Sequence, residues 1–297
     1  MAVQESFKRP TTIQEMHDRM KHFATEEGWQ KGLAYKPGPT DVFIVTPPKC
    51  GTTWMQQIVH GLRTRGAMDF DEITRVVPWL EMAYDCGIDI YAPQVGDPRA
   101  FKSHSTFDQL PKGGKYIIVV RDPKDALVSA YHFMEGMFFE KGSISLETFA
   151  REDFFLGRAI HKHILAFWDR RDDENVLPLC YENMKEDLVG TIERVADFIG
   201  ISLDEELKHI ALKQSDIKFM QQHKHQFEDH IIRKARSAAM QLPIDGQLNK
   251  VRNGQVGESK QVVPDELGNE LDDIWQEEIA AKIGLNSYED LRKELVH

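Results

Sequence analysis

Short apolar runs alternate with longer stretches of helical periodicity along this chain. The runs at residues 42–45, 116–120 and 176–180 have the length and composition of buried strands. Helical patterns follow them or stand between them, at residues 53–64, 123–137, 157–171, 187–199 and 264–283. Strands separated by helices indicate βαβ units. We therefore expect an α/β fold with a central parallel sheet flanked by helices, in a single domain over residues 1–297.

The sequence DVFIVTPPKCGTTW, residues 41–54, places a lysine, a glycine and two threonines where the first strand runs into its helix. The first N–H groups of a helix have no intrahelical acceptor, and the helix dipole adds positive charge, so an anion is stabilised there. Gly51 lets the backbone approach a ligand, while Lys49, Thr52 and Thr53 supply a charge and hydroxyl donors. This predicts a P-loop-like site, although the lysine precedes the glycine, unlike the nucleoside-triphosphate loop. A plain strand-to-helix turn with a surface lysine is the alternative.

A second cluster, Lys102-Ser103-His104, follows Ala100 and Phe101 at the end of a short strand. Ligands of open α/β sheets bind at the carboxyl ends of the strands, which places these side chains near a ligand of the first loop. Histidine suits a general base because its unperturbed pKa lies near neutrality. His104 is therefore a candidate base. A surface or core-edge histidine is the alternative.

The third cluster lies in VVRDPKDALVSAYHF, residues 119–133. Arg121 ends a strand and Ser129 lies two turns into the next helix, so both side chains can converge on one anionic group. The alternative pairs Arg121 with Asp122 or Asp125 and leaves Ser129 packed.

Two later segments complete the set of candidates. Tyr181 follows the third strand, where a tyrosine can contact a base edge. Residues 241–260 are rich in Gly, Asn and Gln and predict a long loop, a kind of segment that is usually functional or mobile. Its RNGQVG run can fold over a phosphate with Arg252 and backbone amides.

Composition limits the partners. The chain has 37 Lys and Arg against 48 Asp and Glu, a net charge of −11, which argues against general affinity for nucleic acid or anionic membrane. Any anion site must therefore be local. Its 3 cysteines form no CxxC pair, and neither a signal peptide nor a membrane-spanning run is visible, so we expect a soluble, cytoplasmic protein.

With these motifs in view, the chain resembles the cytosolic sulfotransferase family from about residue 42 to 258. TPPKCGTTW is similar to the family's TYPKSGTTW loop for the 5′-phosphosulfate of 3′-phosphoadenylyl sulfate, and RDPKDALVSAYHF is similar to its 3′-phosphate segment. FKSHSTF matches the family's KTH triplet. The resemblance implies transfer of a sulfuryl group to a hydroxyl or amine without a metal, releasing adenosine 3′,5′-bisphosphate.

The resemblance also assigns residues. His104 takes the position of the catalytic base, and Lys49 and Lys102 those of the catalytic cations. Trp54 and Tyr181 contact the adenine. Donor binding as a whole falls to Lys49, Cys50, Gly51, Thr52, Thr53, Trp54, Arg121, Ser129, Tyr181, Ser215, Arg252, Asn253 and Gly254.

The chain departs from the family pattern at several positions. Pro48 and Cys50 replace a Tyr and a Ser of the loop, which removes a hydroxyl near the sulfuryl group. Asn253 stands where a Lys of the lid is usual, and Ile217 where an aromatic residue often completes the adenine site. The family's C-terminal dimer motif is missing after the lid, so the oligomeric state is open.

Aromatic and methionine residues flank the expected transfer site and predict an apolar acceptor, such as a hydrophobic alcohol, phenol or glycolipid. They are Trp79, Tyr84, Tyr91, Phe133, Met134, Met137, Phe138 and Phe139. The alternative assigns them to the core. The acidic net charge disfavours a polyanionic acceptor.

Two other functions compete with this interpretation. One is a P-loop kinase, against which stand the lysine before the glycine and the lack of a clear acidic magnesium site. The other is a catalytically silent nucleotide-binding protein of the same fold. The polar run at residues 222–230, which includes Glu228, Asp229 and His230, is interpreted as an exposed helix or loop rather than a metal site.

Overall fold

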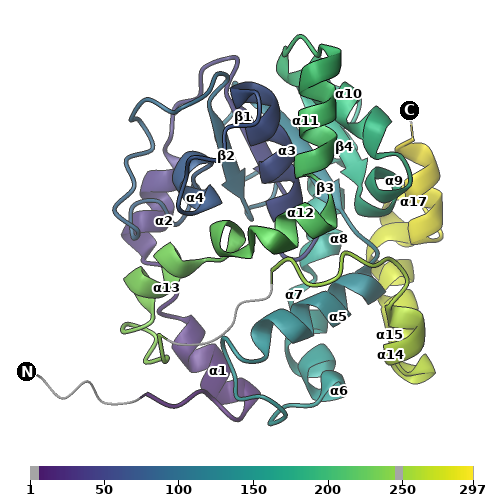
Figure 1. Cartoon of the computed structure of the whole chain (residues 1–297). Helices are drawn as coiled ribbons and strands as arrows, with labels where there is room; N and C mark the ends of the chain where they lie inside the picture. Colours follow the sequence, from purple (N-terminus) through teal and green to yellow (C-terminus); the bar gives the residue numbers. More distant parts are fainter. Residues whose placement is uncertain (1–6, 245–249, 297) are drawn as a thin grey trace, which may run out of the picture.

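The computed structural model describes residues 7–244 and 250–296 and is built around one parallel sheet (Figure 1). Its strands are β1 (Val42–Val45), β2 (Ala100–Ser103), β3 (Lys115–Val120) and β4 (Val176–Cys180), in the order β2-β1-β3-β4. The register pairs Val45 with both Ser103 and Ile118, and Val120 with Cys180. The segments that follow the four strands therefore leave the sheet at one edge, and the predicted α/β fold is confirmed.

Helices surround the sheet. The first group comprises α1 (Ile13–Met20), α2 (Glu26–Leu33), α3 (Thr52–Thr64), α4 (Ile73–Val76), α5 (Pro123–Met134), α6 (Leu146–Phe149), η1 (Ala150–Phe154), α7 (Phe155–Gly157), α8 (Ala159–Trp168), α9 (Tyr181–Glu186) and α10 (Leu188–Ile199). The second comprises α11 (Glu205–Gln214), α12 (Ile217–Gln222), η2 (Lys224–Phe227), α13 (His230–Arg236), α14 (Ser259–Val262), α15 (Asp265–Trp275), η3 (Gln276–Ala280), α16 (Ala281–Ile283) and α17 (Tyr288–Glu294).

Alternate side chains of the strands enter two separate apolar cores. Val42 and Ile44 pack with α3, α10 and α11 on one face of the sheet, while Phe43 and Val45 pack with α8 and the C-terminal helices on the other. Figure 1 shows these helices on the two sides of the strands. Because both faces are covered, every residue of β1 is buried, which explains its uninterrupted apolar run.

Some predicted bounds were too long. The helix that begins at Pro123 ends at Met134, because Glu135 is extended and Gly136 turns with a φ of 79°. The helix expected at 157–171 starts at Ala159, after Arg158 breaks it with a φ of 50°. The long loop is irregular over residues 250–258, and α14 then begins at Ser259.

Candidate active site

The turn between β1 and α3 is built from two residues in left-handed conformation, Lys49 with a φ of 68° and Gly51 with a φ of 95°. A Cβ atom at Gly51 would lie 2.8 Å from Cδ2 of Tyr181, so only glycine fits beside this ring. The helix then starts at Thr52 without a side-chain cap among the described residues. Its first N–H groups face a cavity of about 490 Å³ whose wall includes Thr52 and Thr53. The turn thus has the form of an anion cradle.

His104 lies beside this turn because β2 pairs with β1. Its Nδ1 lies 2.8 Å from the carbonyl oxygen of Thr46, so Nδ1 carries the proton and Nε2 keeps its lone pair. The Trp79 ring packs against the imidazole, with ring centres 4.8 Å apart. Burial and the charge of Lys102 lower the pKa of His104 to about 3, so the ring is neutral at physiological pH.

Two lysines of the cavity wall are held against aromatic rings. Lys49 Nζ lies 4.0 Å from the centre of the Phe133 ring, and Lys102 Nζ lies 4.3 Å from that of Trp79. Burial, with the repulsion of Lys250, lowers the pKa of Lys49 to about 7 and that of Lys102 to about 8. In the free protein the protonated forms of Lys49 and Lys102 are therefore unfavourable. A bound anion would stabilise these protonated forms strongly.

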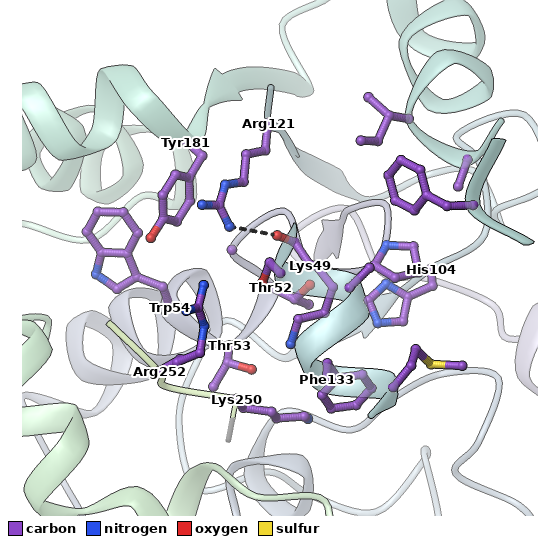
Figure 2. Close-up of a pocket in the computed structure, with 18 of the residues that line it drawn as sticks. Lys49, Thr52, Thr53, Trp54, His104, Arg121, Phe133, Tyr181, Lys250 and Arg252 are labelled. Atoms are coloured by element: carbon purple, nitrogen blue, oxygen red, sulfur yellow. Dashed lines mark hydrogen bonds between the residues drawn. The ribbon is translucent and has the colours of Figure 1, made fainter. Parts of the chain in front are cut away.

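Arg121 combines the two predicted alternatives. Its guanidinium lies 3.7 Å from Asp125 and 4.5 Å from the centre of the Tyr181 ring, and it also lines the cavity together with Ser129. Figure 2 shows it donating to the Lys49 carbonyl, at 3.4 Å. Its Nε is buried without a hydrogen-bond partner among the described residues. The ion pair with Asp125 therefore holds the Arg121 side chain in place, while its Nε–H group remains able to donate to a further hydrogen-bond acceptor.

Another part of the cavity wall, the slot, is formed by Trp54, Ser215, Ile217 and residues 252–254. Trp54 Nε1 donates to the Ser215 carbonyl at 2.9 Å, and its ring lies 5.4 Å from that of Tyr181. The Ser215 hydroxyl oxygen is buried and lacks a hydrogen-bond partner within the part of the chain that is described. Ile217 closes the slot opposite Gly254, where an added Cβ would come within 3.3 Å of Ile217 Cδ1.

The segment predicted as a lid forms one side of this slot. Arg252 and Asn253 line the cavity, and the Arg252 guanidinium pairs with both carboxylate oxygens of Glu258. Asp125 accepts from the backbone N–H of Gly257 at 2.6 Å, which ties the end of the segment to α5. Arg252 therefore borders the cavity with its charge already matched by a carboxylate.

Comparison with known proteins decides the family. A model of the sulfotransferase domain matches residues 39–295. Sulfotransferase 2A1 of Rattus norvegicus is 30% identical over 252 residues, covering 81% of this chain and 84% of the relative. The chain belongs to the sulfotransferase family. The amine sulfotransferase of Oryctolagus cuniculus is likewise 31% identical to this sulfotransferase, covering 80% of each chain.

Solved structures agree in fold. The crystal structure of mouse sulfotransferase SULT7A1 complexed with PAP superposes with a TM-score of 0.65 at 20% identity, covering 92% of this sulfotransferase and 93% of that chain. Retinol dehydratase in complex with androsterone and inactive cofactor PAP gives a TM-score of 0.66 at 18% identity, covering 92% and 96%. The resemblance stated from the motifs is confirmed, and family membership decides against the kinase alternative.

One predicted donor contact is wrong for its side chain. Cys50 is fully buried in the apolar core, its sulfur faces the Pro48 carbonyl at 3.8 Å, and it is not part of the cavity wall. The left-handed residues on both sides of Cys50 turn its side chain inward. Burial raises the pKa of the thiol, so it is neither reactive nor a donor to a ligand in the cavity.

The acceptor side of the cavity is also only partly as expected. Five of the predicted residues line it, together with Met20 and Phe23, which no sequence motif indicated. The five are Trp79, Phe133, Met134, Met137 and Phe138. Tyr84 and Tyr91 are instead 45% and 57% exposed, and Phe139 is a core residue. Tyr84 packs with Lys31 and Tyr91 with Tyr35, both in the N-terminal region, which draws these two rings away from the cavity.

Several charged residues of the cavity wall were missed, among them Asp229 and Lys250. Asp229 was placed in an exposed polar run but is 4% exposed, and Lys250 was not singled out. Both line the cavity, and the Lys250 ammonium hydrogen-bonds to Asp229 Oδ1. Across the described ranges no helix has both the length and the apolar character that crossing a bilayer requires, and no cluster of potential ligands there suits a metal.

Proposed function

We propose that this sulfotransferase moves the sulfuryl group of 3′-phosphoadenylyl sulfate to the hydroxyl of a small apolar acceptor, with His104 as the general base. The observation that carries the proposal is the strand register. By aligning the ends of β1, β2, β3 and β4, it brings Lys49, His104, Arg121 and Tyr181 around one cavity. Figure 2 shows these side chains together.

The cavity wall suits this donor. The glycine turn brings the start of α3, which has no side-chain cap among the described residues, to the cavity wall. The buried Nε of Arg121 and the buried hydroxyl of Ser215 are polar groups in need of a partner. The donor supplies an activated sulfuryl group joined to a phosphate that leaves. Relatives of the same fold were solved with PAP, which is the expected product, adenosine 3′,5′-bisphosphate.

Each donor-binding residue has a role in this proposal. Arg121 and Ser129 bind the 3′-phosphate, while the Thr52 and Thr53 hydroxyls and the start of α3 bind the 5′-phosphosulfate. Trp54 and Tyr181 border the adenine. Ser215, Asn253, Gly254 and Arg252 border it on the other side. Cys50, whose backbone N–H donates to the Pro47 carbonyl, helps to hold the turn that carries Gly51.

His104 and the two lysines perform the transfer. The Nε2 lone pair of His104 accepts the acceptor's hydroxyl proton as its oxygen bonds to sulfur, and the electron pair of the broken S–O bond leaves with the phosphate. Lys49 and Lys102 stabilise the negative charge that grows on the leaving oxygen and on the sulfuryl oxygens. A bound polyanion also raises the pKa of His104 from its low value in the free protein, which makes it a better base.

The apolar wall supports a hydrophobic alcohol, phenol or glycolipid as acceptor. Retinol dehydratase, a relative of the same fold, was solved with androsterone and with retinol, both apolar alcohols. Because one relative is an amine sulfotransferase, amines are included among the acceptors to be tested. A reducing, cytoplasmic setting is part of the proposal, because the 3 cysteines are unpaired thiols.

The test is turnover with radiolabelled donor against alcohols, phenols, amines and glycolipids, followed by His104→Ala. We expect His104→Ala to lower kcat by about a hundredfold or more, since a positioned base contributes about 10² to 10⁴. Its affinity for adenosine 3′,5′-bisphosphate, measured by calorimetry, should stay close to wild type. His209→Ala, on the exposed surface of α11, is the matched control.

Two results would contradict the proposal. An active His104→Ala variant would remove His104 from the role of base. A wild-type protein that binds adenosine 3′,5′-bisphosphate but transfers sulfate to no acceptor class would favour the silent nucleotide-binding alternative.

A further inference from the structure

A buried carboxylate stands among the cations of the cavity. Asp229, at the start of α13, is 4% exposed, and its Oδ1 lies 3.9 Å from Lys102 Nζ. The Lys250 ammonium hydrogen-bonds to the same oxygen. One carboxylate oxygen therefore holds two ammonium groups side by side, one from β2 and one from the segment that precedes Arg252.

Contacts of Glu72 with the residues that follow Asp229 hold Asp229 in place. Glu72 is fully buried, and its Oε2 accepts from the Ile231 N–H at 2.8 Å and lies 3.2 Å from His230 Nδ1. These contacts hold the first turn of α13, and with it Asp229. Burial raises the pKa of Asp229, but Lys250 and Lys102 outweigh this effect and keep the pKa below its usual value, so the group is a carboxylate.

Lys250 is close enough to the transfer site to act on its titratable groups. Its charge is the main influence, after burial, that lowers the pKa of both Lys49 and Lys102, and it also lowers that of His104. In Figure 2 Lys250 lies in the part of the cavity near Thr53 and Phe133, toward which Lys49 points. Its side chain is 10% exposed.

We propose that Lys250 is a third cationic residue of the transfer site, which binds the sulfuryl group, and that Asp229 is the positioning residue that holds it beside Lys102. This inference rests on the proposed function. An ammonium group has three N–H donors. Lys250 can thus keep its bond to Asp229 and still donate to a sulfuryl oxygen, so three lysines face the three oxygens of the transferred group.

The competing explanation is a structural one, in which the Lys250–Asp229 pair only ties the lid segment to α13. The two explanations predict different effects on the affinities for the donor and for adenosine 3′,5′-bisphosphate. The donor and adenosine 3′,5′-bisphosphate differ only by the sulfuryl group, so a sulfuryl contact weakens binding of the donor alone, whereas a loosened lid weakens both ligands alike.

The experiment measures both affinities by calorimetry, without acceptor, for wild type, Lys250→Met and Lys250→Arg. We expect Lys250→Met to weaken donor binding about tenfold to a hundredfold, the loss of one charge-assisted hydrogen bond, and to leave adenosine 3′,5′-bisphosphate affinity nearly unchanged. Lys250→Arg should recover most of the loss. Lys260→Met, an exposed lysine of α14, is the matched control.

Asp229→Asn tests the positioning role by a pH profile. Asp229 raises the pKa of Lys102 and Lys49, whereas burial and Lys250 lower it. Glu72 and Glu81 raise the pKa of Lys102 more weakly, and Arg121 and Arg252 lower that of Lys49. Without the Asp229 charge these lysines lose their protons at lower pH. The alkaline limb of kcat/KM should therefore move to lower pH, which a merely structural role would not produce.

The outcomes separate cleanly. Equal losses of both ligands in Lys250→Met, or no loss of donor affinity, would overturn the role of Lys250. An alkaline limb that stays in place in Asp229→Asn would overturn that of Asp229. If wild type itself fails to turn over, the proposed function fails instead, whatever these variants show.

Discussion

The lysines of the cavity should make donor binding depend on pH. Burial and Lys250 lower the pKa of Lys102 to about 8 in the free protein. The protonated form binds an anion, and a bound anion keeps it protonated, so a rise in pH through 8 removes the cation that the ligand needs. For one group of pKa about 8, the affinity falls about tenfold from pH 7 to pH 9, or about 1.4 kcal/mol.

Lys49 adds to this effect from a lower pH, because its pKa is about 7. The ligand contributes little, since its phosphates have second pKa values of about 6 and are ionised over this range. Calorimetry with adenosine 3′,5′-bisphosphate at three pH values, in buffers of different ionisation enthalpy, measures both affinity and proton uptake. Lys102→Met should bind more weakly but with a flatter pH dependence. An affinity that is constant from pH 7 to pH 9 would refute the reasoning.

Two further predictions concern the turn after β1. Gly51→Ala puts a Cβ 2.8 Å from the Tyr181 ring and forces alanine into a φ of 95°, a strain of about 1–2 kcal/mol. Calorimetry should therefore show that the affinity for adenosine 3′,5′-bisphosphate falls about tenfold. An unchanged affinity would show that the turn relaxes freely. Cys50→Ser buries a hydroxyl in the core and should lower stability to thermal unfolding by about 1–3 kcal/mol without a gain in donor affinity; tighter binding would place the residue 50 side chain at the donor.

Local patterns sufficed for the strands and for the glycine turn that follows β1. The run 42–45 is apolar because it is covered on both faces, and the glycine after it is required by a positive φ. Such features are encoded within a few neighbouring residues. The order of the strands is not encoded locally. It depends on the pairing of β2 with β1, and more than fifty residues of chain separate these two strands.

Burial of charge was where the sequence misled. Apart from Phe227, the run QHKHQFEDH is polar, and nothing within it distinguishes the buried Asp229 from its exposed members such as Lys224 and His225. Asp229 is buried because Lys102, Lys250 and Glu72 reach it from three distant segments. The direction of Cys50 was equally hidden, since it depends on the backbone angles of Lys49 and Gly51 rather than on residue type.

The two ends of the proposed donor site use different cations for a physical reason. An arginine side chain keeps its charge over the physiological pH range. The guanidinium of Arg121 lies beside the Asp125 carboxylate and the face of the Tyr181 ring. Around the transferred group, several fixed guanidinium charges would repel one another in the free protein. Lys49 and Lys102 avoid this, because burial lowers their pKa and lets them release a proton until an anion arrives. The transfer site therefore gains much of its charge together with the donor, and Asp229 limits how far the lysines discharge while the donor is absent.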